Sequence, residues 1–159
     1  MLRKLRARAC AIVLLSVVTL ACSLPRDPEK TSQRLSATRE LRVGVSDSPP
    51  WTSSSHGEPQ GIEPELVRQF AASAGARVRW TPGSETQLVQ ALKHHELDLV
   101  IGGFDKKTQW SSTAGVTQPF AKDSEGKQHV FLAAPGENRF ILDLDRFLTA
   151  HMRASEGQS

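Results

Sequence analysis

Hydrophobic and polar positions change their spacing several times along the chain, and each change predicts a new element. The apolar run over residues 41–45 is typical of a short buried strand. Apolar side chains then recur at helical spacing over residues 62–74, and Gly75 follows at the point where such a helix would end. Alternating charged and apolar residues over 77–80 predict a second strand.

The pattern continues with a second helix and a third strand. Ser84 and Gln87 form a Ser-x-x-Gln capping box, which opens a helix with apolar residues within 88–92. Residues 97–101 predict the third strand, which Gly102 and Gly103 end. Alternation of strands and helices in this order predicts a parallel sheet with right-handed crossovers.

The C-terminal third is less regular, although it closes with a clear helix. Residues 129–134 predict one further strand, and Asn138 is placed to cap a final helix. One face of this helix is apolar and consists of Phe140, Ile141, Leu144, Phe147 and Leu148. We therefore predict an α/β fold over residues 39–152, with three to five mostly parallel strands flanked by helices, and a disordered tail over residues 153–159.

The N-terminal residues have the layout of an export signal. Residues 1–21 combine a basic start with an apolar run of about a dozen residues, too short for the roughly 20 that span a bilayer. Thr19-Leu20-Ala21-Cys22 resembles a bacterial lipoprotein box, with Thr19 at the usual leucine position. We expect a lipid on Cys22, and ordinary cleavage after Ala21 is the alternative. Polar residues 22–38 predict a flexible tether to the domain.

Charge changes the picture in one respect. The net charge is +3, but four basic residues before residue 9 supply +4, so 3 − 4 leaves about −1 for the rest of the chain. A nucleic-acid-binding protein would keep its basic excess in the folded part, so we expect no nucleic-acid partner. From the export signal and Cys22 we expect a protein in the periplasm that contacts the membrane only through a lipid.

Candidate chemistry lies where the predicted parallel strands end. Loops at that edge carry Asp47 and Trp51 after the first strand, residues 81–84 after the second, and residues 102–105 after the third. Trp51 is either an aromatic ligand surface or a hydrophobic plug, and Asp47 either accepts hydrogen bonds from an ammonium group or caps a turn. The paired glycines allow a ligand to approach the backbone closely.

Enzyme signatures are mostly absent from the sequence. It has no Gly-rich phosphate loop, no Gly-x-Ser-x-Gly and no His-Glu-x-x-His motif. His94, His95 and Glu96 are adjacent on a helix and point in different directions, so a solvated helix end is the better interpretation. We expect no metal, no cofactor and no catalysis.

Several segments, taken in order, resemble the family 3 bacterial extracellular solute-binding proteins, the polar amino-acid type of ABC importers. The similarity covers roughly residues 39–120. It rests on Leu41-Arg42-Val43-Gly44-Val45, Pro49-Pro50-Trp51, Gly61 with Glu65-Leu66 and Phe70, Gly75, the helix ending at Leu92, residues 96–103, and Thr117-Gln118-Pro119-Phe120.

The resemblance implies a specific architecture and a specific loss. Family members have two α/β lobes that close on the ligand, and the second lobe would follow Phe120. Here residues 130–133 and the final helix follow after only a few residues, and they resemble the return strand and last helix of the first lobe. The resemblance therefore implies a single periplasmic-binding-protein-like lobe with the second lobe missing.

The resemblance also implies a change of ligand. Counted without gaps, Asp105 falls at a family threonine and Trp110 at an arginine that pairs with the ligand's α-carboxylate. An indole cannot replace a bidentate guanidinium, so an aromatic or cationic ligand suits these residues better. The candidate ligand-binding residues are Asp47, Trp51, Gly102, Gly103, Phe104, Asp105 and Trp110.

The predicted function is that of an exported substrate-binding protein of the ABC-transporter type, which recognises a small polar molecule such as an amino acid or related amine. An ABC permease, or a second chain that closes the cleft, is the expected partner. The alternative is a single-lobe sensor or docking module that binds a protein in the periplasm. Some relatives of this fold carry dehydratase activity or adjoin lytic transglycosylases. For an enzyme, Asp47 and Asp105 are the only candidate acids or bases.

Overall fold

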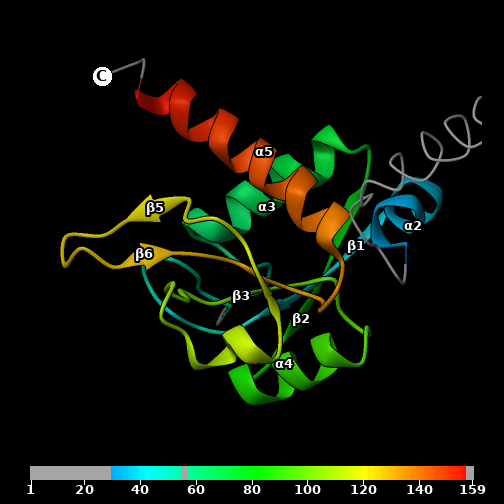
Figure 1. The fold of residues 1–159 in the computed structure, drawn as a ribbon, viewed down its shortest axis with the longest axis horizontal. Helices are drawn as coiled ribbons and strands as arrows, with labels where there is room; N and C mark the ends of the chain where they lie inside the picture. Colours follow the sequence, from blue (N-terminus) through cyan, green and yellow to red (C-terminus); the bar gives the residue numbers. More distant parts are fainter. Residues whose placement is uncertain (1–29, 55–56, 157–159) are drawn as a thin grey trace, which may run out of the picture.

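The computed structural model describes residues 30–54 and 57–156 of the chain (Figure 1). The predicted signal peptide, Cys22 and residues 23–29 of the predicted tether lie outside the described residues. Residues 157–159 of the predicted tail lie outside them as well.

A five-stranded sheet with the strand order β2-β1-β3-β7-β4 forms the centre of the fold. Strand β1 pairs in parallel with β2 and β3, whereas β7 runs antiparallel to both of its neighbours. Four of the five strands therefore point the same way, which confirms the predicted mostly parallel sheet. The strands span Glu40–Val45 (β1), Arg77–Pro82 (β2), Leu99–Ile101 (β3), Gly115–Val116 (β4) and Leu132–Ala133 (β7).

Helices cover both faces of this sheet, so the fold has three layers (Figure 1). Helices α2, α3 and α5 pack on one face around an apolar core that includes Val43, Phe70 and Phe131. Helix α4 packs on the other face, around a second core that includes Leu92 and Val100. The helices span Thr31–Thr38 (α2), Ile62–Ser73 (α3), Glu85–Lys93 (α4) and Asn138–Glu156 (α5).

Local sequence signals account for most of these boundaries. Helix α4 begins directly after Ser84, whose capping box with Gln87 is formed as predicted. Helix α3 carries Glu63 and Glu65 in its first turn, where negative charge is favourable to the helix dipole. Gly75 follows α3 with a positive φ of 66°, which suits the end of a helix.

The sequence predicts one strand over residues 129–134, but the structure divides this segment between two sheets. Strand β6 (Gln128–His129) pairs with β5 (Ala121–Lys122) in a separate antiparallel hairpin, while β7 joins the main sheet. Only this hairpin separates Phe120 from the return strand β7. It projects from the lobe on the side away from α2 (Figure 1). The described chain thus forms a single lobe.

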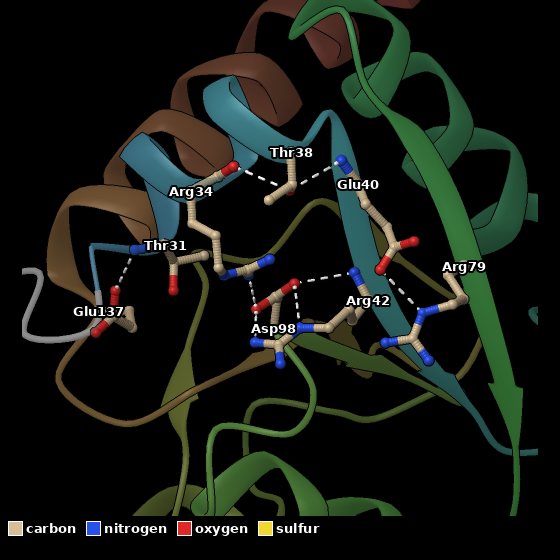
Figure 2. Close-up of polar contacts among 8 residues, drawn as sticks. All are labelled: Thr31, Arg34, Thr38, Glu40, Arg42, Arg79, Asp98 and Glu137. Carbon is tan, nitrogen blue, oxygen red and sulfur yellow. Dashed lines mark hydrogen bonds and ion pairs between the residues drawn. The ribbon is translucent and has the colours of Figure 1, made fainter.

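The predicted flexible tether is wrong for residues 31–38, which form helix α2. Leu35 is buried in the core, and the guanidinium groups of Arg34 and Arg42 both contact the buried carboxylate of Asp98 (Figure 2). The N–H of Thr31 donates to Glu137 Oε2 at 3.0 Å. A polar sequence with one buried leucine shows little helical periodicity, and tertiary contacts of this kind stabilise the helix.

The predicted disorder of the C-terminal tail is likewise wrong for residues 153–156, because α5 continues to Glu156. The apolar face of α5 is buried as predicted, with Phe140, Leu144 and Leu148 almost fully enclosed. Among the described residues, no helix combines the length and the apolar character needed to cross a bilayer.

Candidate functional site

The loops that follow β1 and β3 meet at the carboxyl edge of the sheet, as the parallel arrangement predicts. Gly103 adopts a left-handed φ of 68°, and a side chain at this position would collide with the hydroxyl of Ser48 and touch Trp51. The N–H of Gly83, after β2, donates to the carbonyl of Val45 at 3.1 Å. All three loops therefore lie at one edge.

A buried carboxylate joins two of these loops, and sequence reasoning missed it. Glu63 Oε2 accepts hydrogen bonds from Thr52 Oγ1 at 2.8 Å, Gly102 N at 2.9 Å and Gly103 N at 3.1 Å. Burial raises the pKa of Glu63, and the hydrogen bonds from Gly103, Thr52 and Gly102 oppose that shift. A glutamate in the first turn of a helix normally faces solvent, so the sequence carried no signal of this role.

Trp51 packs against the lobe itself. Its indole stacks on the imidazole of His129, with ring centroids 3.7 Å apart and an interplanar angle of 25°. The ring of Phe120 meets the indole in an edge-to-face arrangement, with ring centroids 6.3 Å apart. One face of the indole is therefore covered by a residue of the hairpin. On that face Trp51 packs against the protein, as a hydrophobic plug would, and offers no surface to a ligand.

Asp47 and Asp105 both hold the turns in which they lie. Asp47 Oδ1 accepts hydrogen bonds from the backbone N–H and the hydroxyl of Ser54, at 2.5 and 2.8 Å. Asp105 Oδ1 accepts from the N–H of Lys107 at 2.6 Å. Asp47 is nevertheless exposed and Asp105 half-buried, so both carboxylates reach the surface of the edge.

The two remaining aromatic candidates lie on the α4 side of the sheet. Phe104 is buried in the core that α4 covers, and Trp110 packs against the same core. The indole N–H of Trp110 donates to Glu85 Oε2 at 3.3 Å. Trp51 packs instead against the core beneath α3 and α5, so the structure does not bring the two indoles together as a facing pair.

A charged cavity of about 230 Å³ lies beside the edge, between the loop after β3 and the turn of the hairpin. It is lined by Asp105, Lys106, Lys107, Glu125, Gly126, Lys127 and Gln128. The N–H of Lys106 donates to the carbonyl of Gln128 at 2.8 Å and joins its two walls. Within the described residues, no three His, Cys, Asp or Glu side chains gather as metal ligands would.

Comparison with known proteins bears on the family and the fold of the chain. The sequence pattern of the bacterial extracellular solute-binding proteins, family 3, matches residues 41–142. Among curated relatives, the membrane-bound lytic murein transglycosylase F of Vibrio cholerae serotype O1 is 28% identical over 107 residues, which cover 67% of this chain and 20% of that protein. The protein of the same name from Idiomarina loihiensis is 28% identical over 155 residues, 94% of this chain and 32% of its own length. The chain thus spans a fifth to a third of these relatives.

Solved structures show the same fold. The arginine-bound form of domain 1 from TmArgBP superposes with a TM-score of 0.67 at 16% identity, over 74% of this chain and 97% of that one. An ancestral amino-acid-binding protein, a precursor of cyclohexadienyl dehydratase, gives a TM-score of 0.68 at 12% identity, over 78% and 94%.

Proposed function

Because the chain belongs to the bacterial extracellular solute-binding proteins, family 3, we propose that its lobe binds a small polar molecule, an amino acid or a related amine, without converting it. One observation carries this proposal: Glu63 hydrogen-bonds to both the loop after β1 and the loop after β3, and so holds them together at one edge of the sheet. A prearranged polar surface of this kind lowers the cost of ordering on binding.

A single lobe is sufficient for such a role. Domain 1 from TmArgBP, to which this lobe is similar, has been solved in an arginine-bound form. Half of a two-lobed site encloses less of a ligand than the 70–90% typical of small-molecule pockets. We therefore expect dissociation constants in the millimolar range, about −4 kcal/mol, for the monomer.

We assign the ammonium group of the ligand to the exposed carboxylate of Asp47. A hydrogen bond to a charged group contributes about 1.5–3 kcal/mol, so its loss weakens binding roughly tenfold or more. Export to the periplasm, a lipid on Cys22 and delivery to an ABC permease belong to the same proposal. The matched relatives are transglycosylases by name, but this chain corresponds to only part of each, and we propose no catalysis for it.

The test is a thermal-shift screen of the purified protein against amino acids, polyamines and aromatic acids, with oligomeric state recorded in parallel. A ligand that binds the folded state raises the unfolding midpoint once its concentration passes the dissociation constant. Asp47→Asn keeps an acceptor for Ser54 and removes the charge, so the same shift should require roughly tenfold more ligand. Asp143→Asn, the same change on α5, is the control and should retain it. Nanomolar binding by a monomer, or equal binding by Asp47→Asn, contradicts the proposal.

The covered face of Trp51 favours a second function, a docking module for a periplasmic protein. His129 occupies the indole surface on which a small ligand would stack. A flat screen on a well-folded protein would favour this function over solute binding.

A further inference from the structure

We propose that Glu63 is a positioning residue of the carboxyl-edge site. Its carboxylate accepts hydrogen bonds from the adjacent N–H groups of Gly102 and Gly103 and holds that turn against the loop of Trp51 and Thr52. An external carboxylate therefore cannot bind to the same two N–H groups. This inference rests on the proposed function in one respect, namely that the edge is where a ligand binds. The positioning itself is testable without a ligand.

The geometry centres on one oxygen atom. Three donors from two loops converge on Glu63 Oε2, at 2.8 to 3.1 Å, and Gly103 N also lies 3.2 Å from Oε1. The side chain is fully buried, so water cannot replace these bonds. Each donor would be left without a partner in the protein interior if this oxygen were removed.

Glu63 also connects the site to a rigid element. It lies in the first turn of α3, and its own N–H donates to the carbonyl of Trp51 at 3.1 Å. One residue therefore contacts the Trp51–Thr52 segment through both backbone and side chain, while the same side chain holds the glycine turn. The two loops move together with the end of α3, and neither can shift without breaking a buried hydrogen bond.

The filled N–H pair has a consequence for specificity. Two adjacent backbone N–H groups are a ready binding site for an anion, and here an internal carboxylate already occupies them. A ligand carboxylate cannot use this point of the edge. The turn therefore does not select for acidic ligands, which agrees with an amine bound near the exposed Asp47.

The experiment measures amide hydrogen exchange and chemical shifts of Gly102 and Gly103 by NMR in four variants of the purified protein. Glu63→Ala removes the acceptor, whereas Glu63→Gln retains a carbonyl oxygen at the position of Oε2. Glu65→Ala and Glu65→Gln make the same changes two residues away, at an exposed glutamate of the same helix turn. Dissociation constants for the best ligand of the screen are measured in parallel.

We expect exchange of both glycine amides to accelerate about tenfold or more in Glu63→Ala, and ligand binding to weaken with it. Glu63→Gln should restore both properties, and the Glu65 variants should match the wild type. Unchanged exchange in Glu63→Ala overturns the inference. If Glu63→Ala accelerates exchange of the two glycine amides but binds the ligand with wild-type affinity, Glu63 does not position the binding site.

A measurement on the wild type keeps the inference falsifiable if Glu63→Ala does not fold. The charge of His129 also acts on Glu63. The amide chemical shifts of both glycines should change with pH as the carboxyl group of Glu63 titrates. Amide chemical shifts that stay constant through this titration overturn the inference. A wild type that binds nothing in the screen refutes the proposed function alone, because exchange still decides the role of Glu63.

Discussion

The indole of Trp51 lies against the imidazole of His129, with 3.7 Å between ring centroids. His129 belongs to the hairpin that stands between Phe120 and the return strand, and its Nε2 lies 3.2 Å from Asp123 Oδ2. Asp123 also accepts hydrogen bonds from the N–H groups of Glu125 and Lys127. The hairpin is therefore a packed part of the lobe, bonded at its turn and stacked at its base.

Replacing His129 tests how much this stack contributes. His129→Ala removes a buried ring, so we expect a loss of about 2–3 kcal/mol in the free energy of unfolding. His129→Phe keeps a ring against Trp51 and loses only the bond to Asp123, which predicts a loss of about 1 kcal/mol. Urea denaturation of both variants measures the difference. Equal losses would show that the ring contact contributes nothing.

Asp98 should be one of the most sensitive positions for stability. Its buried carboxylate accepts hydrogen bonds from Arg34 and Arg42, whose side chains are 27% and 21% exposed (Figure 2). Removing the negative charge of Asp98 therefore leaves two partly buried guanidinium groups without a counter-charge. We expect Asp98→Asn to cost about 2 kcal/mol, below the 3–5 kcal/mol of a fully buried pair because of this exposure.

The same substitution should loosen α2. Limited proteolysis is expected to cleave Asp98→Asn near residues 31–38 faster than the wild type, because Arg34 no longer holds the helix to the sheet. Glu125→Ala is the control, because its ion pair with Lys127 joins two exposed side chains on the hairpin, and its loss should leave the cleavage of α2 unchanged. A wild-type cleavage rate in Asp98→Asn would argue against this account of α2.

Glu63 predicts a pH dependence of stability with a definite sign. Burial raises the pKa of Glu63 above its ordinary value of 4.5, so the folded protein binds this proton more tightly than the unfolded chain. Its contribution is therefore fully present below pH 4.5 and is lost as the pH rises through the folded pKa. Relative to Glu63→Gln, the wild type should lose stability as the pH rises above 4.5. Denaturant midpoints of both proteins across this range should diverge, and parallel curves would contradict the prediction.

Gly103 should not tolerate a side chain. Its φ of 68° strains any other residue, and a Cβ atom would also collide with the hydroxyl of Ser48. Gly75 is a matched control, because its φ of 66° is similar and no atom lies within 4 Å of such a Cβ. We expect Gly75→Ala to cost about 1 kcal/mol and Gly103→Ala at least 1 kcal/mol more. Thermal denaturation compares them, and equal costs would mean that Ser48 moves freely.

Local periodicity was sufficient for the regular part of the fold. Residues 62–74 showed the spacing of the helix that they form, because burial of one face selects apolar residues at the helical period. The apolar runs over 41–45 and 97–101 indicated buried strands, which the structure places at Glu40–Val45 and Leu99–Ile101. The α2 segment showed no such spacing. Helix α2 is held by the buried side chain of Leu35 and by the ion pair between Arg34 and Asp98, which is 64 residues away in sequence. Only the folded chain brings these partners together.

For the site, the sequence determined which loops meet, and the tertiary structure decided what their residues do. The carboxyl ends of parallel strands share one edge, so the strand pattern alone predicts that Asp47, Trp51 and Gly103 lie together. Whether Trp51 faces a ligand or His129 depends on a hairpin more than 70 residues away. The buried role of Glu63 depends on partners 11 to 40 residues distant. Such contacts arise from packing between elements, and no local pattern of residue types encodes them.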